Sequence, residues 1–166
     1  MILLETNRLL LREFTPEDAS DLHEILGDAE TMRYSEPAYD VEKTRRFLTE
    51  FCIGKHGAVA ATLKGSNKVI GYILFHPWSD GIYEIGWFFN RNYWRQGYAY
   101  EACRALIDHG FRELHIHKIV AETIDGQGSV PLMEKLGMQR EGVQRGQVKD
   151  TDGNWADLYL YGKLCK

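Results

Sequence analysis

The chain alternates between stretches of alternating or continuous apolar residues and stretches in which apolar residues recur every third or fourth position. The first pattern is typical of strands, and the second is typical of amphipathic helices. Strands are predicted at residues 8–13, 58–63, 68–75, 82–90, 118–124, 138–149 and 154–164. Helices are predicted at residues 15–27, 40–51, 97–114 and 129–136. The order β-α-α-β-β-β-α-β-α-β-β predicts an α/β fold with a mixed sheet whose first half is antiparallel.

A strand, a helix and a strand follow one another at residues 82–90, 97–114 and 118–124. Such a crossover makes its two strands parallel. The turn that leads into the helix lies at the carboxyl end of the first strand, where ligands usually bind in sheets of this kind. The last two strands meet at Asp152-Gly153, a dipeptide typical of a hairpin turn.

The turn before helix 97–114 contains Arg95, Gly97 and Ala99. The first N–H groups of a helix have no partner within it, and the helix dipole adds positive charge at the same place. Gly97 has no Cβ, so an anion can approach the backbone closely. The turn is therefore predicted to bind a phosphate or pyrophosphate group. The alternative interpretation is that Gly97 serves only the turn itself.

Length and charge narrow the classes of protein and of partner. With 166 residues and a net charge of −4, the chain is expected to form one domain, residues 1–166. No basic patch stands out, so nucleic acid is not an expected partner. No apolar run approaches the roughly 18–20 residues that span a bilayer. The segment Met1–Glu5 lacks the basic start and long apolar region of a signal peptide.

Cysteine and histidine positions indicate the compartment and argue against a metal site. Three scattered cysteines, Cys52, Cys103 and Cys165, fit reduced thiols in a cytoplasmic protein. His115 and His117 have no Cys or Asp cluster that would complete a ligand set, so no metal is expected. A two-fold homodimer is the assembly expected from the frequency of such dimers among oligomers.

Four short stretches, distributed along nearly the whole length of the chain, resemble one protein family. They are Glu5 to Arg12, Glu84 to Trp87 with Tyr93 to Ala102, Ser129 to Met138, and Gly153 to Tyr161. On these stretches the chain is similar to the GCN5-related N-acetyltransferase (GNAT) superfamily. Its nearest resemblance is to the RimJ- and RimL-like branch of ribosomal-protein N-terminal acetyltransferases. The resemblance implies the GNAT fold, with a splayed central pair of parallel strands.

Three positions depart from the family pattern. Arg95 stands where this branch commonly has Gly, so the loop backbone is expected to be stiffer, and the guanidinium could pair with a phosphate. Gly126 stands where the family usually has Asn three residues before Ser129, which removes or replaces a side-chain contact to the acetyl donor. Tyr100 stands where a small hydroxyl residue is common.

The resemblance implies acetyl-coenzyme A (acetyl-CoA) as donor and an amine as acceptor, which attacks the thioester directly in a ternary complex. N–H groups of the turn would hold the pyrophosphate. A backbone N–H near the end of strand 82–90 would stabilise the oxyanion, an effect worth about 2.7–4 kcal/mol. The implied donor-binding residues are Phe88, Phe89, Trp94, Arg95, Gln96, Gly97, Tyr98, Ala99 and Gly126.

Three further side chains are candidates for the chemistry, each with a second interpretation. Glu84 is the candidate general base, or else it pairs with a cation on the neighbouring strand. Ser129 is the candidate proton donor to the leaving thiolate, or else it only caps its helix. Tyr34, in the loop between the first two helices, is the candidate acceptor-binding residue, or else it is a packed surface aromatic.

Two other functions stay open on the sequence. One is a non-catalytic acyl-coenzyme A binding module, which the substitution at Gly126 favours. The other is an enzyme that acetylates polyamines or aminoglycoside antibiotics, which would require an acidic acceptor cleft. The expected acceptor is therefore either a protein N-terminal α-amine or a small-molecule amine.

Overall fold

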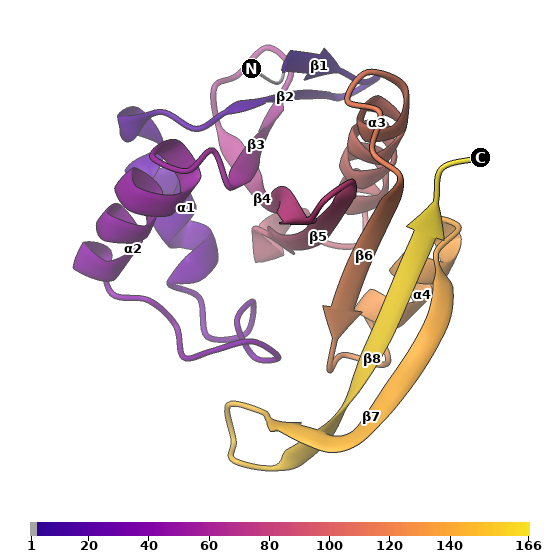
Figure 1. Cartoon of the computed structure of the whole chain (residues 1–166). Coiled ribbons are helices and arrows are strands. Elements are labelled where there is room, and N and C mark those ends of the chain that lie inside the picture. The colour runs from indigo at the N-terminus through magenta and orange to yellow at the C-terminus, as the bar shows by residue number, and fades with distance from the viewer. Residues whose placement is uncertain (1–2) are drawn as a thin grey trace.

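The computed structural model describes residues 3–166; Met1 and Ile2, which belong to the N-terminal segment considered above, lie outside this range. One eight-stranded mixed sheet runs through the molecule (Figure 1). Its strands are β1 (Leu3–Glu5), β2 (Leu9–Glu13), β3 (Ala58–Leu63), β4 (Val69–Ser79), β5 (Ile82–Phe89), β6 (Lys118–Thr123), β7 (Gln139–Lys149) and β8 (Trp155–Leu164). The α-helices are α1 (Ala19–Leu26), α2 (Val41–Phe47), α3 (Tyr98–Arg112) and α4 (Ser129–Lys135).

The strand order is β1-β2-β3-β4-β5-β6-β8-β7, and all neighbours are antiparallel except β5 and β6. This confirms the predicted mixed sheet, its antiparallel first half and the parallel pair joined through α3. Two features go beyond the prediction. The predicted order lacks β1, because three residues are too few to show a period. The final hairpin joins the sheet through β8, which leaves β7 at the edge.

Helices cover both faces of the first half of the sheet, with α1 and α2 on one face and α3 on the other (Figure 1). Successive side chains of a strand point to opposite faces. In β4, Ile73 therefore packs with α3, whereas Tyr72 packs with α1 and α2. Leu106 of α3 is fully buried against the sheet. The core thus fixes the position of α3, and with it the turn that precedes the helix.

Local signals in the sequence set several boundaries. Asp40 caps α2 as predicted, since its Oδ1 accepts from the backbone N–H of Lys43 at 2.7 Å. The predicted single helix after it continues as a π-helix, Leu48–Ile53. The final hairpin turns at Asp152-Gly153 as predicted, with Gly153 at φ 84°. Within residues 3–166, no helix is long and apolar enough to cross a membrane.

Candidate active site

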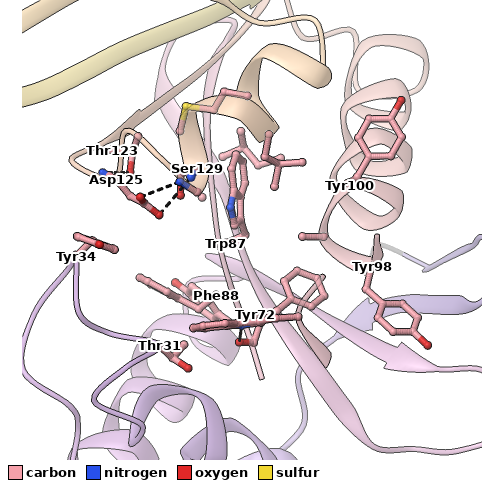
Figure 2. Close-up of a pocket in the computed structure, with 18 of the residues that line it drawn as sticks. Thr31, Tyr34, Tyr72, Trp87, Phe88, Tyr98, Tyr100, Thr123, Asp125 and Ser129 are labelled. Carbon is pink, nitrogen blue, oxygen red and sulfur yellow. Dashed lines mark hydrogen bonds between the residues drawn. The ribbon is translucent and has the colours of Figure 1, made fainter. Parts of the chain in front are cut away.

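A cavity of about 800 Å³ opens between the two halves of the sheet. Its walls come from β5, the end of β6, the first turns of α3 and α4, and the loop that carries Thr31 and Tyr34. Figure 2 shows Trp87, Phe88 and Tyr72 along its middle, Tyr98 and Tyr100 at the α3 end, and Tyr34 with Asp125 at the opposite end. The cavity therefore joins the predicted phosphate turn to the region around Glu84.

The cavity exists because β5 and β6 pair over a short distance and then diverge. In the part of the chain that the structure describes, their ladder contains Ile82 with Lys118, Tyr83 with Ile119, and Glu84 with Val120. Residues 85–89 continue β5 without a partner on β6, although they remain paired with β4. The splayed parallel pair implied by the family resemblance is thus present. Its open backbone edge can accept hydrogen bonds from an extended ligand, as a further strand would.

The turn before α3 has the backbone of an anion site. Arg95 (φ 61°) and Gly97 (φ 82°) are both left-handed. Left-handed residues in a turn are typical of concave anion sites formed by backbone N–H groups. Within residues 3–166, no side-chain cap bonds the first turn of α3, whose N-cap is Gly97, so its N–H groups remain available for a ligand. Trp94, Tyr98 and Ala99 line the cavity together with these two residues. Their contact with a pyrophosphate remains a prediction.

A network from the start of the chain supports this turn from behind. The guanidinium of Arg8 donates from Nη1 to the carbonyl of Gln96 at 2.9 Å and from Nε to Glu101 at 2.7 Å. It also lies 4.1 Å from the ring centre of Tyr98. Thr6 Oγ1 donates to the same Glu101 carboxylate at 2.6 Å. Sequence reasoning gave Arg8 no role, although the stretch Glu5 to Arg12 contributed to the family resemblance.

Glu84 lies on the cavity wall, at the last position where β5 pairs with β6. Its Oε1 is 3.7 Å from Nε2 of His76, the residue opposite it on β4. Burial, and after it the negative charge of Glu122, raise the pKa of Glu84 above its usual value, while His76 acts in the opposite direction. His76 is the cross-strand neighbour that the second interpretation of Glu84 requires. The role of Glu84 as a base remains a prediction.

The predicted N-cap role of Ser129 is wrong. Gly128 occupies the N-cap position, and Ser129 is the first residue of α4. The carboxylate of Asp125 accepts instead, from the N–H groups of Gln127 (3.2 Å), Gly128 (2.9 Å) and Ser129 (3.2 Å). An acidic side chain just before the helix reaches three donors, more than a serine hydroxyl at the cap can. Ser129 lines the cavity, and its proton transfer to a thiolate remains a prediction.

Two predicted donor-binding residues lie outside the cavity lining. Gln96 holds Arg8 through its carbonyl, and its side-chain amide donates to the carbonyl of Asn92 at 3.4 Å. Gly126 faces Tyr159, since a Cβ on Gly126 would lie 3.3 Å from that hydroxyl. The remaining predicted residues line the cavity, including Phe88, Phe89 and Tyr34. Their contacts with donor or acceptor remain predictions.

Charge divides between the two ends of the cavity. Arg95 and Lys135 line the end near α3, where the Lys135 ammonium lies 4.2 Å from the ring centre of Tyr100. The acidic residues of the lining are Glu30, Glu84, Glu122 and Asp125. The cationic end fits an anionic ligand group, and the acidic end fits a group that is or becomes positively charged.

Comparison with known proteins gives the same fold and names the family. The model of the acetyltransferase (GNAT) domain matches residues 8–139. The uncharacterized N-acetyltransferase YnaD of Bacillus subtilis is 34% identical over 165 residues, which is 97% of this chain and 96% of YnaD. A GNAT-family acetyltransferase from Bacillus anthracis, solved by crystallography, shares 33% identity at a TM-score of 0.90, with 98% of each chain covered.

The structure of RimL, a ribosomal-protein α-N-acetyltransferase in complex with coenzyme A, has a TM-score of 0.85 over 98% of both chains. Because the two sequences are only 18% identical, this similarity supports a shared fold and not a shared function. The RimJ- and RimL-like branch therefore stays a prediction, whereas the family does not depend on it. On the domain match, the relatives above 30% identity and the shared fold, this chain belongs to the GNAT acetyltransferase family and is an N-acetyltransferase.

Proposed function

We propose that this enzyme transfers the acetyl group of acetyl-CoA to a primary amine, by direct attack in a ternary complex. One observation carries the proposal: a single cavity connects the uncapped first turn of α3 with the carboxylate of Glu84. One end of this cavity carries Arg95 and Lys135, and the other carries acidic side chains. The two reactants of such a transfer are complementary to these charges, because the donor carries an anionic diphosphate and the acceptor carries an amine.

The chain's own groups suit the donor. The left-handed turn at Arg95 and Gly97 offers N–H groups to a diphosphate, and the α3 dipole favours negative charge there. The unpaired edge of β5 after Glu84 offers backbone groups to the amides of an extended pantetheine arm. A bound thioester supplies the activated acetyl group. An N–H at the end of β5 would then stabilise its oxyanion.

The acceptor has to lose a proton before it can attack. At pH 7, about a tenth of the molecules of an N-terminal α-amine with a pKa of about 7.7–8.0 are neutral, whereas a lysine amine is almost entirely charged. We infer that Glu84 takes the remaining proton, directly or through water, because it lines the same cavity as the open β5 edge that begins after it. Its raised pKa makes it a better base than an exposed carboxylate.

The test is an amine panel with acetyl-CoA, scored by release of free thiol. The panel contains peptides with different first residues, polyamines and simple alkylamines. Glu84→Gln is expected to lower kcat by about 10²–10⁴-fold while acetyl-CoA still binds by calorimetry, since the base is removed and the donor turn is not. Glu113→Gln, which removes an exposed carboxylate at the far end of α3, is the matched control.

The same variant has a stability signature with a definite sign. The folded-state pKa of Glu84 is raised, so its contribution favours folding below its ordinary pKa and is lost as pH rises through the folded value. Glu84→Gln should therefore melt at or above the wild-type temperature at pH 7. Binding of acetyl-CoA without thiol release for any amine would contradict the proposal. That result would instead favour the non-catalytic acyl-coenzyme A binding module.

A further inference from the structure

A second cavity of about 280 Å³ lies beside the first, between the sheet and the segment that runs from α1 to the π-helix. Four residues line both cavities: Tyr72, Leu74, Glu84 and Phe88. Glu84 is the acidic residue among these four. A molecule whose amine lies beside Glu84 can therefore extend its remaining atoms into the second cavity.

The second cavity has a continuous aromatic wall, formed by Tyr39, Phe47, Phe51, Tyr72 and Phe88. Phe47 stacks on Phe51 with ring centres 5.2 Å apart and touches Tyr72 at 5.7 Å. Tyr72 stacks in turn on Phe88 at 6.1 Å, so that the wall continues into the first cavity, where both rings are visible in Figure 2. Leu26 and Met32, both about 1% exposed, close the cavity on the α1 side.

An aromatic wall can hold either an apolar group or a cation, so the charges beside it decide between the two. Besides Glu84, the second cavity has one carboxylate, Glu36. Glu36 is already paired with Lys43 at 3.1 Å, and that ammonium also lies 4.3 Å from the ring centre of Tyr39. A second ammonium on the ligand would meet the charge of Lys43 there.

Two of the acids of the first cavity, besides Glu84, also have partners within the chain. Asp125 accepts three backbone N–H groups. Glu30 lies 3.9 Å from the guanidinium of Arg33. Glu122, the fourth acid of that lining, lines the first cavity and not the second, so its charge does not draw a further ammonium into the second cavity. The charge distribution favours an apolar group in the second cavity.

We propose that the acceptor is a primary amine with an aromatic or large aliphatic group close to its nitrogen, and that this group fills the second cavity while the nitrogen lies at Glu84. The proposal rests on the proposed function and specifies its acceptor. The apolar group can belong to an arylalkylamine or to the first side chain of a peptide. The aromatic wall and Leu26 select for it, and the polyamine alternative is disfavoured.

The experiment compares kcat/KM for four acceptors at one acetyl-CoA concentration: 2-phenylethylamine, 1,4-diaminobutane, a peptide that begins with Phe, and the same peptide beginning with Ser. The aromatic acceptor of each pair is expected to exceed its polar partner by at least about tenfold, since a single methylene in an apolar pocket is worth about 10–200-fold. The two pairs distinguish a small amine from a peptide as the source of the apolar group.

Phe51→Ala removes part of the aromatic wall without touching the first cavity. The ratio of kcat/KM between aromatic and polar acceptors is expected to fall at least about tenfold in this variant. Phe111→Ala, which shortens a half-buried phenylalanine of α3 outside both cavities, should keep the wild-type ratio. Phe51→Leu retains an apolar side chain and should keep most of the ratio, and acetyl-CoA affinity reports whether each variant is folded.

The wild-type ranking alone can overturn the inference. If the diamine and the Ser peptide both have a kcat/KM equal to or higher than that of their aromatic partners, the second cavity does not bind an apolar acceptor group, and the proposed acetyl transfer would still stand. An unchanged ratio in folded Phe51→Ala would have the same meaning. Failure to acetylate any amine would instead remove the proposed function, and the inference with it.

Discussion

Glu84 combines two environments in one side chain. It is half-buried between strands, and its carboxylate is 3.7 Å from the imidazole of His76. Burial acts first to raise its pKa, and the negative charge of Glu122 adds to the effect. A base whose pKa lies near the operating pH is more effective than a base whose pKa lies far below that pH. The charge of Glu122 therefore offers a way to adjust the base without touching it.

Glu122→Gln should shift the pH dependence of kcat/KM. Activity of a carboxylate base rises as pH passes its pKa, because the deprotonated form is the active one. Removing the charge of Glu122 stabilises the ionised form of Glu84 and lowers its pKa, so the acid limb of the profile should move to lower pH. A rate profile between pH 4 and 8 measures this. An acid limb that stays in place would exclude Glu84 as the titrating base.

Arg95 is the second residue whose local conformation has a consequence. Its φ of 61° is left-handed, a region that costs a residue with a Cβ about 1–2 kcal/mol. The family branch that the chain resembles commonly has glycine at this position. The strain is compatible with a functional position, because Arg95 is exposed and lines the cavity where a phosphate is expected.

Arg95→Gly should therefore separate stability from affinity. Loss of the strain, offset by the greater freedom of glycine, should raise the free energy of unfolding in urea by up to about 1 kcal/mol. Loss of the guanidinium should weaken acetyl-CoA binding about tenfold, because a hydrogen bond to a charged group is worth about 1.5–3 kcal/mol. Arg95→Lys keeps a cation and the strained backbone, so it should retain most of the affinity without the gain in stability. Unchanged affinity in Arg95→Gly would show that the guanidinium does not contact the donor.

At the scale of the element, α3 and α4 begin in different ways. The first N–H groups of α4 are bound by Asp125 within the chain, whereas α3 has no side-chain cap among the residues that the structure describes. The first turn of α3 is held instead from its outer side, through the contacts of Arg8 with Gln96 and Glu101. The open end of α3 is therefore fixed in place and still free to bind an anion.

Arg8→Lys tests this support, in which Arg8 acts as a positioning residue. Lysine keeps the charge but lacks the rigid guanidinium that donates to Glu101 from Nε and to Gln96 from Nη1, so the turn should lose order. KM for acetyl-CoA is expected to rise about tenfold with a smaller change in kcat, and the free energy of unfolding to fall by about 1 kcal/mol. Arg112→Lys, at the exposed far end of α3, is the control. Equal KM values for Arg8→Lys and wild type would mean that the network only stabilises the fold.

At the scale of the whole molecule, the eight-stranded sheet consists of two halves that are joined only along a short parallel ladder, called the seam below. The seam is the parallel ladder from Ile82 to Glu84, and the cavity occupies the wedge beyond it. A ligand bound in the wedge contacts both halves, so it should stabilise the folded protein as a whole. The chain positions its two halves with α3, which follows β5 and precedes β6 (Figure 1).

Coenzyme A at about 100 times its Kd should add about 2.7 kcal/mol to the free energy of unfolding. Amide hydrogen exchange should slow at residues 85–89 and in the first turn of α3, since those backbone groups are expected to bond the ligand. Pantetheine, which has no phosphate group, should slow amide exchange along the β5 edge and leave the exchange rates of the α3 turn unchanged. Protection confined to other parts of the chain would place the donor elsewhere.

Local patterns in the sequence were sufficient for much of this fold. The β5-α3-β6 crossover, the Asp40 cap and the turn at Gly153 depend on residues that are close in sequence. Of the predicted site residues, Glu84 and Ser129 both reach the cavity, because the crossover determines which strand and helix ends meet. Periodicity reports which face of an element is buried, and crossover topology fixes the handedness and direction of the strands.

Other features depend on contacts that no local pattern encodes. Arg8 and Glu101 are 93 positions apart, and His76 meets Glu84 only through the register of β4 with β5. The aromatic wall collects residues from the loop before α2, α2 itself, the π-helix and two strands. The sequence by itself determined the helices, all strands but β1, and the turn before α3, because these follow from short-range periodicity and backbone chemistry. Tertiary packing alone decided the wedge, the supports of the turn and the second cavity, because each requires surfaces that are distant in the chain to meet.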